Sequence, residues 1–269
     1  MPTPAVTVQT VMNLMERIAP KHLAEDWDNP GLLVGSPVQQ VTGIVTCLDV
    51  SGIVIEQALA HDANLIISHH PLIFKPQKHL RTDQPLGAML QKLLQHHLNV
   101  FAAHTNLDIA EGGVNDVLAA KIGLGKLSTL LITSQEPDGT THSLGRIGYL
   151  PQPMTLQAFA AQVKASLPCT YLRYVDAGMR PVRKVALCSG SGADLIDRAA
   201  MLGADCYVTG DIRYHDAQHA QALGLHLIDA GHYATEFPIA AALATRLRDA
   251  LSHVPIYADQ QSKDFFAVM

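Results

Sequence analysis

The most constraining feature of this 269-residue chain is a repeated alternation of short apolar runs with segments of helical periodicity. Short apolar runs are typical of buried strands, and apolar residues spaced three and four apart are typical of amphipathic helices. The alternation occupies residues 42–124 and starts again at residue 144. A strand–helix–strand order favours a mostly parallel sheet flanked by helices on both faces. The chain is therefore expected to be an α/β protein with two lobes.

Turn-forming residues separate the two alternating regions. The segment QEPDGTTH, residues 135–142, collects Pro, Asp, Gly and Thr, which predicts a loop or a hairpin turn. We expect residues 1–126 to form the first lobe and residues 127–231 to form the second. Residues 232–269 contain a helical pattern and a last short strand pattern, and we expect them to pack back on the first lobe.

The composition excludes several classes of protein. A hydrophobic fraction of 48% and a charged fraction of 16% exclude a disordered chain. A net charge of −5 and an aromatic fraction of 5% argue against a nucleic-acid partner. Neither a membrane-spanning stretch nor a secretory signal pattern occurs, and the four cysteines form no C-x-x-C pair. We expect a cytoplasmic protein with buried free thiols and no membrane partner.

Imidazole and carboxylate side chains follow three predicted strands at the points where those strands end. In parallel α/β sheets, ligands bind outside the carboxyl ends of the strands, so these side chains are expected to converge. Their residue types predict a metal site. They are His69 and His70 after the first strand, His104, Asn106 and Asp108 after the second, and His232 and Glu236 after the third.

The spacing of these residues favours two metal ions. Adjacent residues on an extended chain point to opposite sides, so His69 and His70 are expected to serve different ions, and Pro71 keeps His70 extended. His232 and Glu236 are four residues apart and share one face of a predicted helix. Carboxylates lower the repulsion between two cations and can bridge them, as in dinuclear hydrolases.

Two further motifs each have competing interpretations. The Gly-x-Gly turn in residues 188–196 either presents N–H groups to an anion or simply requires a positive φ. Residues 208–220 place four polar side chains at a strand end, where they either orient metal ligands or begin a helix capped by the first of them. The adjacent pair His96 and His97 is expected on a solvated helix face. The four polar side chains are Asp211, His215, Asp216 and His219.

Five segments, in this order, resemble the Nif-three-like family, which includes bacterial YbgI and proteins labelled GTP cyclohydrolase I type 2 homologues. Together they extend over nearly the whole chain, so the resemblance is more specific than any single glycine motif. The segments are WDNPGLLVG (27–35), ISHHPLIF (67–74), HTNLDIAEGGVND (104–116), GADCYVTGDIRYHDAQHA (203–220) and DAGHYATE (229–236).

The resemblance implies a Nif-three-like fold of two α/β lobes, assembled as a homohexamer that is a trimer of dimers. It also implies a dinuclear centre with two divalent cations per subunit. Imidazole and carboxylate ligands suit Fe, Zn, Mn, Ni and Co alike, so they do not identify the metal. The metal ligands that the family motifs place in this chain are His69, His70, Asp108, His232 and Glu236.

The first functional hypothesis is a metal-dependent hydrolase of a small-molecule substrate. His104 is assigned to proton transfer or to orienting a ligand, because it precedes a ligand without being needed as one. A GTP cyclohydrolase reaction fits, since it requires water attack at the purine C8, and so does hydrolysis of a phosphate ester or an amide ring. The alternative is a non-catalytic metal-binding or metal-delivery protein that forms a ring scaffold.

Overall fold

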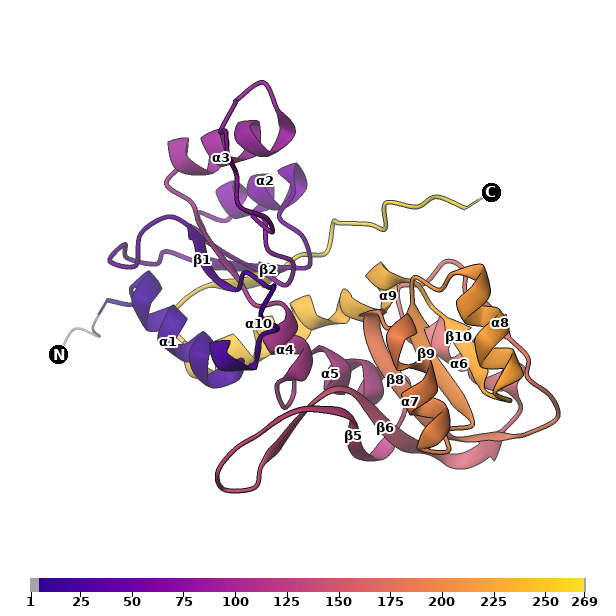
Figure 1. Cartoon of the computed structure of the whole chain (residues 1–269). Coiled ribbons are helices and arrows are strands. Elements are labelled where there is room, and N and C mark those ends of the chain that lie inside the picture. Colours follow the sequence, from indigo (N-terminus) through magenta and orange to yellow (C-terminus); the bar gives the residue numbers. More distant parts are fainter. Residues whose placement is uncertain (1–4, 269) are drawn as a thin grey trace. The chain divides into compact units, whose positions relative to one another are not determined.

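A computed structural model describes residues 5–268 as two compact units, each built on one β-sheet (Figure 1). The first unit runs to Leu107 and resumes over Ile239–Lys263, and the second covers Asp108–Pro238 together with the residues from Asp264. The predicted α/β class, with two sheets flanked by helices, is confirmed. The sequence predicted the boundaries between the two lobes near residues 126 and 232.

The sheet of the first unit has the strand order β1-β4-β3-β2-β11. Its four strands from β4 to β11 run parallel, and β1 is antiparallel to β4 at one edge. Every residue of β2 and β3 is buried, which explains why both strands appear in the sequence as unbroken apolar runs. The bounds are β1 (Gly31–Val34), β2 (Ile44–Cys47), β3 (Leu65–Ser68), β4 (Asn99–Ala102) and β11 (Ile256–Ala258).

Helices cover both faces of this first sheet. Val54 of α2 and Leu93 of α3 pack against Val45 of β2 on one face. On the other face, the Thr46 hydroxyl donates to the Ala240 carbonyl of α10 over 2.7 Å, and α1 lies on the same side (Figure 1). The helices are α1 (Val8–Ile18), the 3-10 turn Lys21–Leu23, α2 (Gly52–Ala60), α3 (Pro85–Gln95), α4 (Thr105–Ile109) and α10 (Pro238–Ala250).

The sheet of the second unit has the order β5-β6-β8-β9-β10-β7 and is mixed. Only β8, β9 and β10 are parallel, whereas β5, β6 and β7 add antiparallel pairs at the two sides. The expectation of a mostly parallel sheet therefore holds in the first unit alone, because the predicted turn at residues 135–142 joins two long hairpin strands. The bounds are β5 (Gly125–Gln135), β6 (Thr141–Met154), β7 (Arg173–Val175), β8 (Val182–Ser191), β9 (Cys206–Gly210) and β10 (His226–Asp229).

Alternate residues of β8 point to opposite faces of this second sheet. Val185 and Leu187 pack with Phe159 of α6, whereas Ala186 and Cys188 pack with residues of α7 and α8. Each face thus has its own apolar cluster under a pair of helices. The helices are α5 (Val114–Lys121), α6 (Leu156–Ser166), the 3-10 turn Ala193–Leu195, α7 (Ile196–Met201), α8 (Tyr214–Ala222) and α9 (His232–Glu236).

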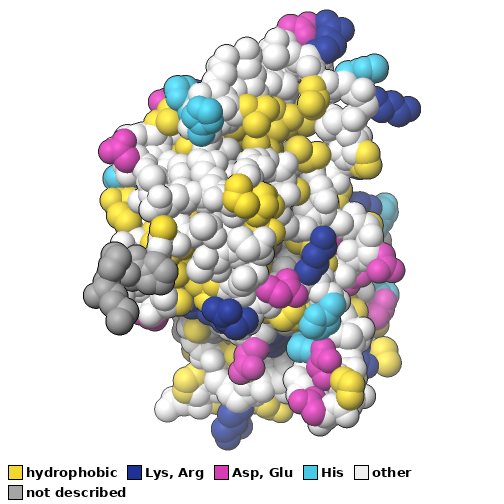
Figure 2. All heavy atoms as spheres, turned by 90° about the vertical axis from the view of Figure 1, so that its left-hand side faces the viewer, with side chains coloured by type: hydrophobic (Ala, Val, Ile, Leu, Met, Phe, Trp, Pro, Cys, Tyr) yellow, Lys and Arg dark blue, Asp and Glu magenta, His cyan; other side chains and the backbone are white. Residues whose placement is uncertain are grey.

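The structure bears on three expectations that came from composition. Within residues 5–268, no helix combines the length and the apolar character needed to cross a bilayer. All four cysteines are free thiols, and three are buried, while Cys169 is half-buried. On the face shown in Figure 2, acidic, basic, histidine and hydrophobic side chains are interspersed, so this face carries no broad cationic surface.

Removal of the Phe159 ring should destabilise the second unit. Phe159 is fully buried, so Phe159→Ala is expected to lower the free energy of unfolding by about 3–5 kcal/mol. Phe266 is 75% exposed, and Phe266→Ala should change it by no more than about 0.5 kcal/mol. Urea unfolding followed by far-UV circular dichroism measures both, and equal losses would contradict this description of the core.

Candidate metal centre

The first histidine pair is fixed in place by the sheet of the first unit. The backbone N–H groups of His69 and His70 donate to the carbonyls of Cys47 and Leu48 over 3.1 and 2.9 Å. The pairing of β2 with β3 therefore continues one residue beyond β2 and two residues beyond β3. Because this ladder holds the backbone, the positions at which the two imidazoles leave the sheet are set by strand pairing rather than by a flexible loop.

The ends of β3 and β4 bring a third imidazole to this pair. The ring centroids of His69 and His70 are 5.1 Å apart, and those rings lie 5.2 and 5.6 Å from the ring of His104. One nitrogen from each of the three rings lies within 4.8 Å of the others, a spacing that can hold a metal ion. The predicted convergence of the first two strand ends is confirmed.

In each of these three imidazoles, Nδ1 is hydrogen-bonded to an oxygen acceptor. A carbonyl or an ionised carboxylate can only accept, so Nδ1 carries the proton and donates it. In the neutral ring the lone pair is then on Nε2, the arrangement that metal-binding histidines use. The pairs are His69 with the Ala103 carbonyl at 2.9 Å, His70 with Asp49 at 2.8 Å and His104 with Asp28 at 2.8 Å.

Asp28 is the most constrained of these acceptors. Its side chain is fully buried and also accepts from the Thr105 backbone N–H and hydroxyl, over 3.0 and 2.5 Å. Burial by itself would raise the pKa of Asp28, but the hydrogen bonds from His104 and Thr105 outweigh it and lower the pKa to about 2. Asp28 is therefore ionised beside His104. We did not predict it as a site residue, although it lies in the WDNPGLLVG segment.

A second group of predicted ligands lies in the second unit. Glu236 Oε2 is 3.0 Å from His232 Nε2, which confirms that these residues share one face of α9. A carboxylate oxygen of Asp108 lies within 4.8 Å of one of Glu236, and both residues are buried. The Ser189 hydroxyl at the end of β8 donates to Asp108 over 3.3 Å. This group therefore holds two carboxylates and one imidazole.

The pKa values of His232 and Cys188, which lie in and beside this second group, are both raised. Burial alone would lower the pKa of His232, but Glu236 and then Asp211 outweigh it and raise the pKa to about 9. Burial, and then the negative charges of Asp108 and Glu236, raise the pKa of the Cys188 thiol well above its usual range. Both shifts reflect a concentration of negative charge, which a bound cation would offset.

One of the four polar residues after β9 orients an imidazole. Asp211 accepts from His232 Nδ1 over 2.8 Å, and its backbone adopts a left-handed conformation with φ of 56°. Asp211 therefore orients the ring of a predicted ligand and does not cap α8. Asp216 instead accepts from the backbone N–H at the start of α8, and His219 is exposed and paired with Asp197.

The glycine near the end of β8 provides space for Glu236. Gly190 has φ of +63°, which confirms the interpretation of a turn that requires a positive φ. A Cβ atom at this position would lie 2.2 Å from Glu236 Oε1 and 3.3 Å from His232 Nε2. A side chain at position 190 would therefore overlap the Glu236 carboxylate and crowd the His232 ring.

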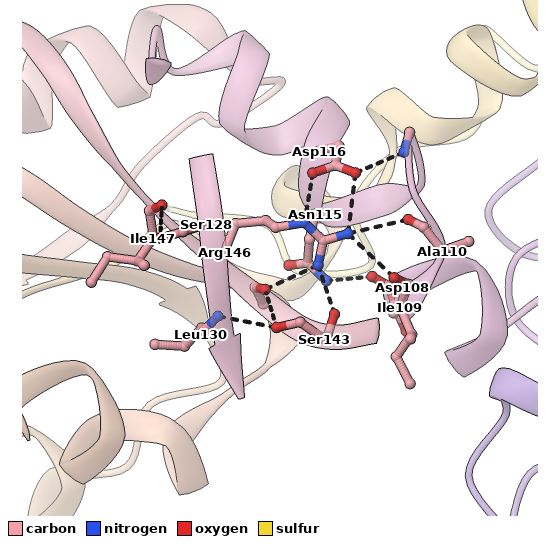
Figure 3. Close-up of polar contacts among 12 residues, drawn as sticks. Asp108, Ile109, Ala110, Asn115, Asp116, Ser128, Leu130, Ser143, Arg146 and Ile147 are labelled. Atoms are coloured by element: carbon pink, nitrogen blue, oxygen red, sulfur yellow. Dashed lines mark hydrogen bonds and ion pairs between the residues drawn. The ribbon is translucent and has the colours of Figure 1, made fainter. Parts of the chain in front are cut away.

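Arg146 holds the segment that follows Asp108 (Figure 3). Its guanidinium donates to Asp116 over 2.6 Å, to the Ser143 carbonyl over 2.6 Å, and to the carbonyls of Ile109 and Ala110 over 3.2 Å. Arg146 is 8% exposed, so these bonds form largely away from water. No sequence pattern singled it out, because most of its partners lie outside β6.

Asn115 links Asp108 to the end of β8. Its amide nitrogen donates to the Asp108 carbonyl over 3.0 Å, and its amide oxygen accepts from the Ser189 backbone over 2.9 Å. Asn115 is fully buried at the start of α5. Asp108 is thus positioned by its backbone as well as by its side chain, and Asn115 was also missed, although it lies in the HTNLDIAEGGVND segment.

The predicted ligands are distributed over both units. The expected convergence relied on a single parallel sheet, but β10 belongs to the second sheet, so that argument applies only to the ends of β3 and β4. A single centre formed by all five ligands therefore stays a prediction of the resemblance. Within the units, the structure groups His69, His70 and His104 in the first and Asp108, His232 and Glu236 in the second.

Comparison with known proteins places these groups in a family. Residues 6–264 match the model of Duf34/NIF3 (NGG1p interacting factor 3). The chain belongs to the Duf34/NIF3 family. A protein from Clostridium acetobutylicum named GTP cyclohydrolase 1 type 2 homolog is 34% identical over 264 residues, 97% of this chain and 98% of the relative. The resemblance inferred from the five segments is confirmed.

Solved structures of related proteins agree with this fold. A Bacillus cereus protein described as related to NIF3 is 29% identical, with a TM-score of 0.93 over 99% of this chain and 100% of that one. A Staphylococcus aureus protein is 31% identical, with a TM-score of 0.92 over 98% of this chain and 99% of that one. Family members thus share the arrangement of elements described above.

Loss of the Arg146 guanidinium should destabilise the segment that carries Asp108. Arg146→Met leaves the Asp116 carboxylate and several buried carbonyls without this donor, so unfolding should become easier by about 3–5 kcal/mol. The matched control is Arg81→Met, since Arg81 pairs with Asp83 on the surface, where an exposed ion pair contributes little to stability. Chemical denaturation of the two variants measures the difference, and similar small losses would refute the role of Arg146.

Asp28 should make stability depend on acid pH. Because its folded pKa of about 2 lies below the unfolded value of 3.8, Asp28 stabilises the fold above about pH 4 and this contribution disappears as pH falls toward 2. Asp28→Asn should therefore cost about 2 kcal/mol near neutral pH and progressively less in acid. The exposed Asp26→Asn serves as control. A cost that does not change with pH, measured by denaturation at several pH values, would contradict this.

Proposed function

We propose that this chain is a metal-dependent hydrolase whose predicted ligands hold two divalent cations. One observation carries the proposal: imidazoles whose Nδ1 atoms are engaged by oxygen acceptors occur together with buried carboxylates in one small chain. Metal-binding histidines show this engagement, because it fixes the tautomer and the orientation of the ring. The proposed ligands are His69, His70, Asp108, His232 and Glu236.

The residues present fit a divalent cation. Imidazole nitrogen and carboxylate oxygen form the donor set that Zn, Fe, Mn, Co and Ni share in proteins. A cation would offset the negative charge around Asp108 and Glu236, whose burial is otherwise costly. The absence of a side chain at Gly190 leaves room for the Glu236 carboxylate. These three features favour a cation in the second unit as well as among the histidines of the first.

The histidine group and the first carboxylate are close in the sequence. His104 immediately precedes α4 and Asp108 lies within it, so a single helical turn leads from the histidine group to the first carboxylate. The Asn106 side chain accepts from the His104 backbone and donates to the Ala19 carbonyl, which anchors the start of this helix. The homohexamer implied by the resemblance is part of the same proposal.

In this proposal, His104 moves the proton during hydrolysis. Divalent cations supply positive charge that polarises a substrate oxygen and lowers the pKa of water. His104 Nε2 accepts a proton while the Nδ1 proton stays on the bond to Asp28, and the ionised Asp28 stabilises the imidazolium that forms. The His104 side chain is 17% exposed, which leaves its ring accessible to a substrate. It then returns the proton to the leaving group.

GTP is the first substrate to test. Relatives of this chain carry the name GTP cyclohydrolase 1 type 2 homolog, and water attack at the purine C8 uses the groups proposed here. Hydrolysis of a phosphate ester or of a cyclic amide needs the same polarisation and proton transfer. If the metal-loaded protein hydrolyses none of these substrates, the hydrolase proposal fails and a metal-binding scaffold takes its place.

Removing the first histidine pair should remove metal. The double variant His69→Ala and His70→Ala is expected to weaken metal affinity by more than about 10–100-fold. Loss of a residue that only hydrogen-bonds to a ligand already has an effect of that size. The control is His96→Ala with His97→Ala, since this adjacent pair is exposed at the end of α3. Elemental analysis after dialysis, with circular dichroism to verify folding, measures both. Equal metal content in the two double variants would reject the site.

His104 should separate catalysis from metal binding. His104→Ala is expected to keep its metal and to lose about 10²–10⁴-fold in rate, because only proton transfer is removed. His219→Ala is the control, since His219 also pairs with an aspartate but lies exposed on α8. Steady-state turnover and metal analysis on the same samples distinguish the possibilities. Loss of metal would make His104 a ligand, and full activity would leave it without a catalytic role.

A further inference from the structure

Two exposed aromatic side chains lie beside the histidine group of the first unit. Trp27 is 59% exposed and Phe74 is 43% exposed, and their ring centroids are 5.8 Å apart. Both rings contact His104 edge-on, with centroid distances of 6.0 and 6.2 Å. Large aromatic side chains usually contribute to folding by being buried, so an exposed pair at this position requires another explanation.

The backbone under both rings is fixed. Trp27 immediately precedes Asp28, whose buried carboxylate is bound to His104 and Thr105. The Asn29 side chain donates to the Ile73 carbonyl over 2.6 Å, which ties the segment after Trp27 to the residue before Phe74. The exposed rings therefore belong to anchored segments rather than to a loose loop, and rigid aromatic groups bind at low entropic cost.

We propose that Trp27 and Phe74 form a platform that binds a planar heteroaromatic ring of the substrate beside His104. The planes of Phe74 and His104 lie at 64° and 73° to the indole, so neither of these rings stacks flat on it. A flat ligand ring can stack there, an interaction worth about 1–3 kcal/mol for a nucleic-acid base. The assignment rests on the proposed function, since it places the ring where His104 would act.

The size of the platform favours a small ligand over a protein. A stable protein interface removes about 800 Å² from each partner and involves about 20–30 residues on each side. Two partly exposed aromatic side chains, each with about 150–250 Å² of surface in total, supply much less than that. The same area is sufficient for one or two fused heteroaromatic rings. A planar ring is therefore the occupant to which the platform is best matched.

The single tryptophan of the chain gives a direct test. Guanosine is titrated into the wild-type protein while Trp27 fluorescence is followed, with ribose as the ring-free control, in both chelator-treated and metal-loaded samples. Saturable quenching by guanosine in both samples, and none by ribose, is the expected result. The platform would be overturned if guanosine caused no saturable quenching, or if it quenched only the metal-loaded sample. A change of fluorescence with protein concentration alone would also overturn it.

Variants connect the signal to the two rings. Phe74→Leu should weaken guanosine binding about tenfold or more, whereas Leu94→Ala, at an exposed apolar position on α3, should not change it. Trp27→Leu removes the fluorophore, so equilibrium dialysis measures its binding, with the same loss expected. Equal binding by all three variants overturns the proposal. These measurements also use chelator-treated protein, so they do not depend on a bound metal. If the protein holds no metal, the proposed function is refuted but this test of the platform is unaffected.

Discussion

The hydrogen bond from a histidine Nδ1 atom to an oxygen acceptor is the interaction on which the candidate centre depends. It occurs at the ends of β3 and β4 in the first unit, and again in the second unit, where Asp211 accepts from His232. A rotating imidazole would present either nitrogen in many directions, but an engaged ring presents one nitrogen in one direction. The acceptor aspartates therefore do as much to define the centre as the predicted ligands do.

In the second unit, close backbone packing supplies the corresponding constraint. A Cβ atom on Gly210 would lie 2.7 Å from both the Gly190 carbonyl oxygen and the His232 nitrogen. The ends of β8 and β9 and the residues after β10 therefore come closer together than a side chain at position 210 permits. Asp211 follows this glycine directly and adopts a left-handed backbone. Such strain persists only where the surroundings fix it, which is common at functional sites.

Much of the fold could be predicted because it depends on local patterns. Buried parallel strands appear as apolar runs, residues 135–142 appear as a turn, and the spacing of His232 and Glu236 places them on one helix face. The antiparallel pairs of the second sheet were not predicted, since strand order depends on contacts between distant segments. Asp28 and Arg146 were missed for the same reason: their site partners lie 76 and 30 or more residues away in the chain.

The discontinuity of the first unit bears on how the protein is made. Its last strand, β11, pairs with β2 but is translated after every strand of the second unit. During synthesis, one edge of β2 therefore stays unpaired while β5 to β10 emerge from the ribosome. An unpaired edge invites association with other chains, so this stretch of the nascent polypeptide is the one most exposed to aggregation. The sheet that begins first in the gene is thus the one that is completed last.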